Sequence, residues 1–129
     1  MILKIKRDER GLATIEMAFA LPILLLFIYG IFQVGMIMAA SAGMQHALGE
    51  GARLATIYPT PTDTAIKTQI NNKLFGAYVG KFTVADPVAD PTGKSYKDLS
   101  VTYTVTPNYL FFTAPDITLV RSKRVYLSF

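Results

Sequence analysis

The sequence predicts an α+β protein in which one long N-terminal helix crosses a membrane and continues into a small head. Three observations support this fold class. Residues 17–40 are almost wholly apolar, small and apolar residues continue at helical spacing to about residue 58, and the last third of the chain contains segments that alternate at strand spacing. We expect the head to hold one further helix and an approximately three-stranded antiparallel sheet.

Composition limits the chain to at most one small folded domain besides the apolar run. It has 129 residues, of which 51% are hydrophobic, and it contains no cysteine. Disulfides, metal-thiolate sites and a cysteine nucleophile are therefore excluded. The net charge is +4, and four of the thirteen basic residues lie in the first ten positions: Lys4, Lys6, Arg7 and Arg10. This placement indicates membrane orientation and not nucleic-acid binding.

The apolar run has the length of a transmembrane helix. About 20 residues at about 1.5 Å each cross a hydrocarbon core of about 30 Å, so the span is expected at about residues 17–40. The next basic residue after Arg10 is Arg53, so the positive-inside rule places the N-terminus in the cytoplasm and the head outside. A cleaved secretory signal is an alternative, with Ala40-Ser41-Ala42 as its cleavage pattern, but the run is longer than the usual core of about 7 to 15 residues.

The stretch RGLATIEM defines the start of this helix. The basic leader ends at Gly11, the apolar helix begins at Leu12, and Glu16 is the fifth residue after the glycine. The following residues, EMAFALPILLLFIYGIFQVG, add Pro22 and two glycines. Together these motifs resemble the class III signal and opening helix of TadE-like proteins, the minor pilins or pseudopilins of tight-adherence (Tad) systems. Met17 stands where that family commonly has phenylalanine or tyrosine.

The resemblance implies a processing event and a role for Glu16. A prepilin peptidase would cut after Gly11, and the new amino group of Leu12 in one subunit would pair with Glu16 of a neighbour. The implied partners are this peptidase and other major and minor pilin-like subunits, in a hetero-oligomer. A simpler interpretation needs no partner, because Glu16 lies about 9 Å from Arg10 along a helix and can reach the headgroup region itself.

Further positions in the helix indicate packing. Pro22 removes a backbone donor and should bend the helix. Small residues recur every fourth position, which favours close approach of another helix, although small residues also suit any membrane helix. With Pro22, the candidate packing residues are Gly30, Gly35, Ala39, Gly43, Ala47 and Gly51.

The helix is expected to continue to Tyr58, because Pro59 disfavours helix in the residue before it. The predicted organisation is therefore a cytoplasmic leader (residues 1–11), a long helix (12–58) and an extracytoplasmic α+β head (59–129). His46 is the only histidine, and we expect it on a solvated helix surface, not in a metal site.

In the head, Thr60 is predicted to cap a second helix with Pro61 and Asp63 in its first turn. Its buried face is expected to contain Ile66, Ile70, Leu74 and Tyr78, and the glycines at 76 and 80 are expected to end it.

Three strands follow, at residues 81–85, 99–106 and 117–127. In the middle strand the inward side chains should be Leu99, Val101, Tyr103 and Val105. The run Arg121-Ser122-Lys123-Arg124 predicts a bulge or an exposed edge in the last strand. The repeated Ala-Asp-Pro between the first two strands is interpreted as turn chemistry, because its spacing fits no calcium loop.

An aromatic loop, PNYLFFTAP, separates the last two strands. It contains Tyr109, Leu110, Phe111 and Phe112, which are costly to leave in water. Either they fold back onto the head and helix, or they form an assembly contact with another pilin-like subunit.

The sequence therefore favours an assembly role over catalysis. The resemblance implies a pseudopilin or minor pilin that primes, caps or supports a Tad pilus for adherence, located in the bacterial inner membrane. The alternative is an uncleaved single-pass envelope anchor that presents a small ligand-binding domain. The sequence contains no nucleophile-base pair, phosphate loop or metal spacing, so we expect no enzyme activity, no metal and no cofactor. The single C-terminal basic cluster supplies too few contacts for nucleic acid.

Overall fold

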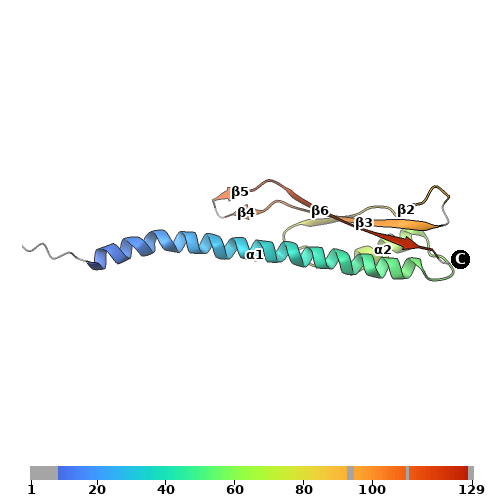
Figure 1. The fold of residues 1–129 in the computed structure, drawn as a ribbon, viewed down its shortest axis with the longest axis horizontal. Coiled ribbons are helices and arrows are strands. Elements are labelled where there is room, and N and C mark those ends of the chain that lie inside the picture. The colour runs from blue at the N-terminus through green and yellow to red at the C-terminus, as the bar shows by residue number, and fades with distance from the viewer. Residues whose placement is uncertain (1–8, 93–94, 110, 128–129) are drawn as a thin grey trace, which may run out of the picture.

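A computed structural model of the chain describes residues 9–92, 95–109 and 111–127. A small α+β head packs along the C-terminal part of one long helix, whose N-terminal part extends beyond the head (Figure 1). Lys4, Lys6 and Arg7 of the predicted leader and Leu110 of the aromatic loop lie outside the described residues. The elements are α1 (Glu9–Ala55), α2 (Asp63–Lys73), β1 (Lys81–Val84), β2 (Val88–Ala89), β3 (Tyr96–Val105), β4 (Asn108–Tyr109), β5 (Phe112–Thr113) and β6 (Ile117–Tyr126).

Helix α1 has 47 residues and includes Pro22 without ending there. At about 1.5 Å per residue it is about 70 Å long. Within the described residues it is the one helix that is long and apolar enough to cross a membrane. It ends at Ala55, three residues before the predicted end at Tyr58, where the Thr56 hydroxyl donates a hydrogen bond to the Arg53 carbonyl (2.8 Å) and the chain turns.

Helix α2 begins two residues later than predicted. Its N-cap is Thr62, whose side-chain oxygen accepts a hydrogen bond from the Ala65 amide, so the prediction of Thr60 was wrong. Ile66 and Ile70 are buried as predicted. The helix ends at Lys73 because Leu74 is already extended (φ −69°, ψ 138°). The predicted helical face therefore does not reach Tyr78, which is 73% exposed.

Strand β3 is the centre of an antiparallel sheet. Strand β6 pairs with its full length on one side, while β1 and β2 share the other side. All three predicted strands are present, and Leu99, Val101, Tyr103 and Val105 are buried as predicted. The β3–β6 pairing runs without interruption from Tyr96 opposite Tyr126 to Val105 opposite Ile117, so the chain has an exposed edge in β6 and no bulge there.

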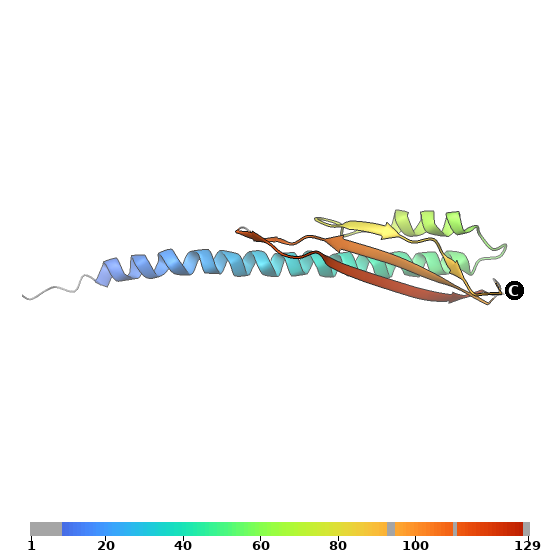
Figure 2. The same ribbon diagram turned by 90° about the horizontal axis from the view of Figure 1, so that it is seen from above.

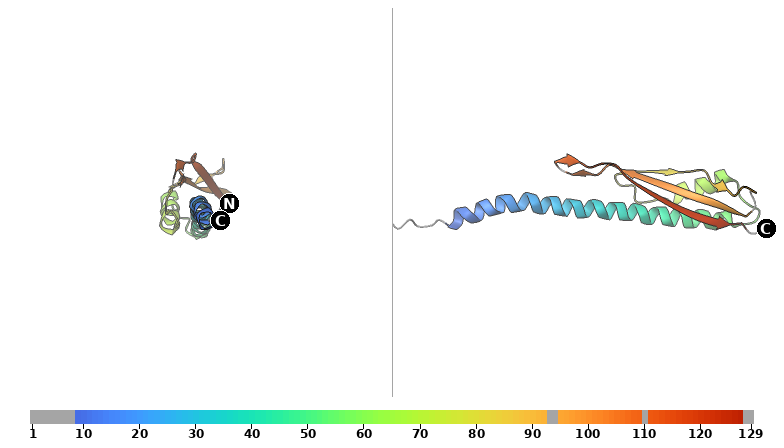
Figure 3. Two further views of the ribbon diagram at one scale, coloured as in Figure 1. Left: turned by 90° about the vertical axis from the view of Figure 1, so that its left-hand side faces the viewer. Right: turned by 45° about the horizontal axis from the view of Figure 1, so that its top comes forward.

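The core lies between one face of the sheet and the two helices. Figure 3 shows α1 and α2 side by side beneath the sheet, and Figure 2 shows the strands crossing the C-terminal half of α1. The fully buried side chains include Met44 from α1, Ile66 and Ile70 from α2, and Leu99, Val101 and Tyr103 from β3. The head is therefore built directly on α1.

The β4–β5 hairpin extends past the sheet and runs back along α1 toward its N-terminus (Figure 1). Its Tyr109 ring is the nearest group to Gly30, at 3.9 Å from the position of a Cβ on that glycine. The head thus reaches a part of α1 that the sequence assigns to the membrane.

Candidate functional site

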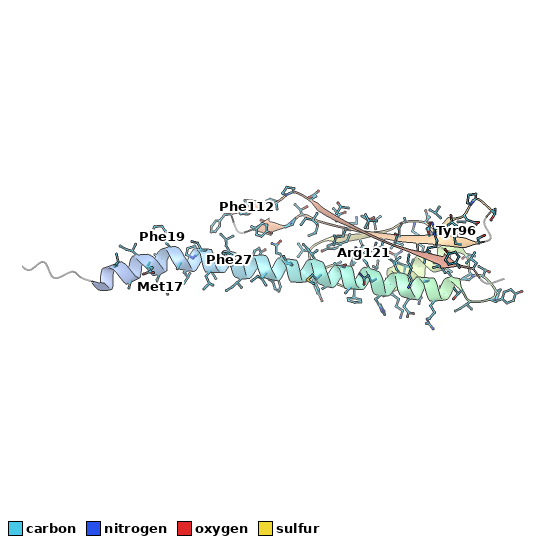
Figure 4. All side chains as sticks on the ribbon, in the orientation of Figure 1. Met17, Phe19, Phe27, Tyr96, Phe112 and Arg121 are labelled. Carbon is cyan, nitrogen blue, oxygen red and sulfur yellow. The ribbon has the colours of Figure 1, made fainter. Side chains whose placement is uncertain are left out.

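The N-terminal part of α1 is an apolar helix that the rest of the described chain leaves uncovered. Every residue from 11 to 25 is exposed, including Leu12 (70%) and Phe19 (72%), and Figure 4 shows Met17 and Phe19 projecting from this bare segment. Apolar side chains of this size lose about 1.5–3 kcal/mol each when they stay in water instead of an apolar environment. This segment therefore requires lipid or neighbouring helices around it.

The predicted processing residues lie on this bare segment. Gly11, Leu12 and Glu16 are all exposed. Among the described residues, Glu16 has no ion-pair partner within its own chain. Pro22 is also exposed and lies inside the helix.

The outer half of the small-residue ridge packs within the chain itself. A side chain on Gly43 would overlap the carbonyl oxygen of Phe75 and come within 2.9 Å of its carbonyl carbon. A side chain on Gly51 would collide with Ile70 of α2, and Ala47 between these glycines is fully buried. This part of the ridge is thus covered by α2 and by the segment that follows α2 in the same chain.

The inner half of the ridge is more open. Gly35 has nothing within 4 Å of its Cβ position, and it lines an apolar groove of about 490 Å³ together with Ala39 and Tyr78. Gly76 packs against the backbone of Ala39, and a Cβ atom on Gly76 would lie 2.8 Å from the Ala39 carbonyl. Gly76 also has a φ of +88°, which glycine adopts without strain. Within the part of the chain that the structure describes, the ridge is therefore open to a helix from another subunit around Gly35.

The aromatic loop is divided between the two predicted arrangements. Tyr109 is half-buried on α1 and stacks on Phe112 with a centroid distance of 4.9 Å. Phe111 and Phe112 nevertheless stay 74% and 57% exposed. Figure 4 shows Phe112 alongside the part of α1 that carries Phe27. The loop folds back onto the helix but leaves two phenylalanines without cover.

Gln33 anchors this hairpin and was not singled out from the sequence. Gln33 is a polar residue of α1 that is buried, with 6% exposure. Its side-chain amide donates a hydrogen bond to the Asn108 carbonyl. The sequence signal that could have identified Gln33 is its position as one amide side chain inside an otherwise apolar run. A buried polar group in such a run generally has a partner from another segment, and here the partner is 75 residues away.

The basic cluster of β6 is distributed over both faces of the sheet. Arg121 lies opposite Val101 and so faces α1, where its guanidinium donates to the Ser41 hydroxyl at 3.1 and 3.3 Å. Arg124 lies on the other face, opposite Asp98, and donates two 2.8 Å hydrogen bonds to that carboxylate. These bonds lower the pKa of Asp98 and raise the pKa of Arg124.

Arg124 also lies 4.0 Å above the centroid of the Tyr96 ring, which in turn meets Tyr126 edge-on. This arrangement forms an ordered polar and aromatic patch on the outer face of the sheet.

His46 is exposed beside Phe75, as expected for a surface residue. Across the described ranges, no three His, Cys, Asp or Glu residues are grouped so that they could hold a metal ion.

Comparison with known proteins supports the resemblance seen in the sequence. The family model described as TadE-like protein matches residues 11–53, which begin at the predicted cleavage residue Gly11 and cover most of α1. No curated protein and no solved structure matches the chain. The family whose model matches residues 11–53 is thus the one that the motif around Glu16 predicted.

Proposed function

We propose that this protein is a TadE-like pseudopilin or minor pilin that takes part in assembly of a Tad pilus, as a priming, tip or platform subunit. The observation that carries the proposal is the bare apolar segment at residues 11–25, which belongs to the family match and has no cover within the described chain. Lipid supplies that cover while the subunit is in the membrane, and neighbouring apolar helices supply it after assembly.

Processing provides the proposed partner for Glu16. A prepilin peptidase cuts after Gly11 and leaves Leu12 with a free amino group, and the Glu16 carboxylate of one subunit pairs with that amino group on a neighbour. Separate charges in a low-dielectric environment are costly, and pairing them offsets much of that cost. The exposure of Glu16 and the absence of an ion-pair partner in its described surroundings support this role.

The proposed orientation places the N-terminus in the cytoplasm and the head on the other side of the bacterial inner membrane. The positive-inside rule supports this arrangement, because four basic residues precede the apolar run and the next one is Arg53. The role is structural: the partners are major and minor pilin-like subunits and the peptidase.

N-terminal sequencing of the membrane-extracted protein tests the processing step. A chain that begins at Leu12 supports the pilin role. A chain that begins at Met1 supports an uncleaved anchor that presents a ligand-binding head. A chain that begins at Gly43 indicates a secreted product, although that cut would divide α1 inside the packed head, where Met44 is fully buried.

The variant Glu16→Ala separates processing from assembly. We expect the chain to be processed and to remain in the membrane but to be lost from isolated pili or from crosslinked complexes with pilin-like subunits. Glu50→Ala is the matched control, because it removes a carboxylate from the same helix whose hydrogen bond and ion pair in the described structure are with the nearby Arg53. Normal assembly of Glu16→Ala would contradict the pairing.

A further inference from the structure

The β4–β5 hairpin is an uncharged, aromatic projection of the head. The chain contains no charged residue from Leu99 to Pro115, and Tyr109 pairs with Phe112 at the end of this stretch. The hairpin lies along α1 at the level of Gly30 and Gln33 (Figure 1, Figure 4). Its side chains Phe111 and Phe112 are 74% and 57% exposed.

The length of α1 between Leu12 and the hairpin corresponds to the thickness of the hydrocarbon core of a bilayer. From Leu12 to Tyr29 there are 18 residues, which at about 1.5 Å each span about 27 Å, close to a hydrocarbon core of about 30 Å. A membrane span that begins at Leu12 therefore ends next to the hairpin. Residues 31–40 lie beyond that level.

A span over residues 17–40 is difficult to reconcile with the head. It would place the β4–β5 hairpin in hydrocarbon, where the open edges of a two-stranded ribbon leave backbone groups without partners. It would also bring the guanidinium of Arg121 to the membrane level, since this group is bonded to Ser41 at the end of that span. The contacts of the head thus favour a span of about residues 12–30.

At the base of the hairpin, backbone carbonyl groups accept hydrogen bonds, whereas its end carries apolar side chains. At the base, the Ala114 amide donates to the Pro107 carbonyl (2.8 Å) and the Gln33 amide donates to the Asn108 carbonyl. At the end, Phe111 and Phe112 are exposed, and Tyr109 lies against the helix. Tyrosine is enriched at the interface between headgroups and acyl chains, and phenylalanines on the apolar side of an interfacial segment bury their rings at that boundary.

We propose that the β4–β5 hairpin is a second membrane contact, in which Phe111 and Phe112 insert into the headgroup and acyl-chain boundary of the leaflet on the head side, next to the part of α1 that carries Phe27 and Gly30. The molecules that cover Phe111 and Phe112 in this proposal are lipids. The inference rests on the proposed function, in which α1 spans the membrane. It places the head against the bilayer surface and lifts residues 31–40 out of the hydrocarbon.

The absence of cysteine in the chain makes a depth measurement direct. The full chain is reconstituted in vesicles of phosphatidylethanolamine and phosphatidylglycerol, with a single environment-sensitive fluorophore at Ile23→Cys, Met38→Cys or Phe111→Cys. All three side chains are exposed in the isolated chain (57%, 67% and 74%). Quenching is measured with nitroxide-labelled lipids and with iodide in the water.

We expect the label at position 23 to be quenched by nitroxides placed deep in the acyl chains and protected from iodide. The label at position 111 should be quenched by nitroxides near the headgroup, and that at position 38 should be accessible to iodide. Thr113→Cys, on the exposed β5, repeats the measurement with both phenylalanines retained.

The outcomes separate the inference from the proposed function. Lipid quenching at 23 with iodide quenching at both 111 and 113 would overturn the hairpin contact and leave the anchor intact. Protection of 111 and 113 from both quenchers would also overturn it, since that result indicates cover by another protein. Absence of lipid quenching at 23 would refute the membrane span itself, and the inference with it.

Discussion

Replacing Gly43 by alanine should separate two effects that glycine has in a helix. Alanine is more favourable than glycine in a helix interior by about 0.8–1.0 kcal/mol. At Gly43, however, the added methyl group would overlap the backbone carbonyl of Phe75, an obstacle that cannot rotate away. Such overpacking costs about 1–3 kcal/mol, and a backbone obstacle favours the upper end of that range. We expect a net loss of about 2 kcal/mol.

Gly49→Ala is the matched control. Gly49 lies on the same helix, and nothing stands within 4 Å of its Cβ position. The gain in helix propensity should appear there alone, as a stabilisation of about 1 kcal/mol. The propensity term cancels in the comparison, so the separation of about 3 kcal/mol between the variants measures the contact with Phe75.

The assay is thermal unfolding of the full chain in detergent micelles, followed by near-ultraviolet circular dichroism of the tyrosines. This signal reports packing of the head, whereas the apolar part of α1 stays helical in the micelle. At about 4–8 °C per kcal/mol for a domain of this size, the midpoints should differ by more than about 10 °C. Equal midpoints for the two variants would refute the packing of the 74–76 segment on α1.

Three further predictions concern the head. Tyr103→Phe should leave stability unchanged or raise it by about 1 kcal/mol in denaturant titrations, because the Tyr103 hydroxyl is buried without a hydrogen-bond partner in the described structure; a clear loss would contradict this. Thr62→Ala should cost about 1 kcal/mol in the same titrations through loss of the α2 cap, and an unchanged midpoint would contradict the cap. Because Arg124 lowers the pKa of Asp98, this pair should contribute stability above the ordinary carboxyl pKa of 3.8 and lose it as the pH falls through the lowered value. Arg124→Gln should return the Asp98 pKa toward 3.8 in a carboxyl NMR titration, and an unchanged value would refute the assignment.

The parts of the fold that the sequence predicted are those in which periodicity and burial coincide. Strand β3 alternates strictly, and each residue predicted to point inward is buried. The β6 cluster was harder to interpret, because side-chain polarity and strand parity disagree there. Leu119 and Val125 lie on the face of the sheet that packs on the helices. Strand parity places Arg121 and Lys123 on that same face, although charge alone predicts that they lie on the outer face.

The candidate site was predictable in α1 and not in the hairpin. The motif around Glu16 is local, and it was sufficient to indicate the family that matches residues 11–53. Strands β4 and β5 have two residues each, too few for a periodic signal, and their position depends on the distant contact between Gln33 and Asn108. The end of the membrane span could not be predicted for the same reason, since composition alone does not distinguish lipid from a covering head.

The continuity of α1 has a mechanical consequence for any assembly that contains this protein. One helix carries both Glu16 and the buried residues on which the head is built, such as Met44 and Ala47, without a break in between. A shift of one residue in the register of α1 against a neighbouring helix therefore moves the head by about 1.5 Å along the axis and turns it by about 100°. A partner that fixes the height and angle of Glu16 also fixes the direction in which the Arg124–Tyr96 face points.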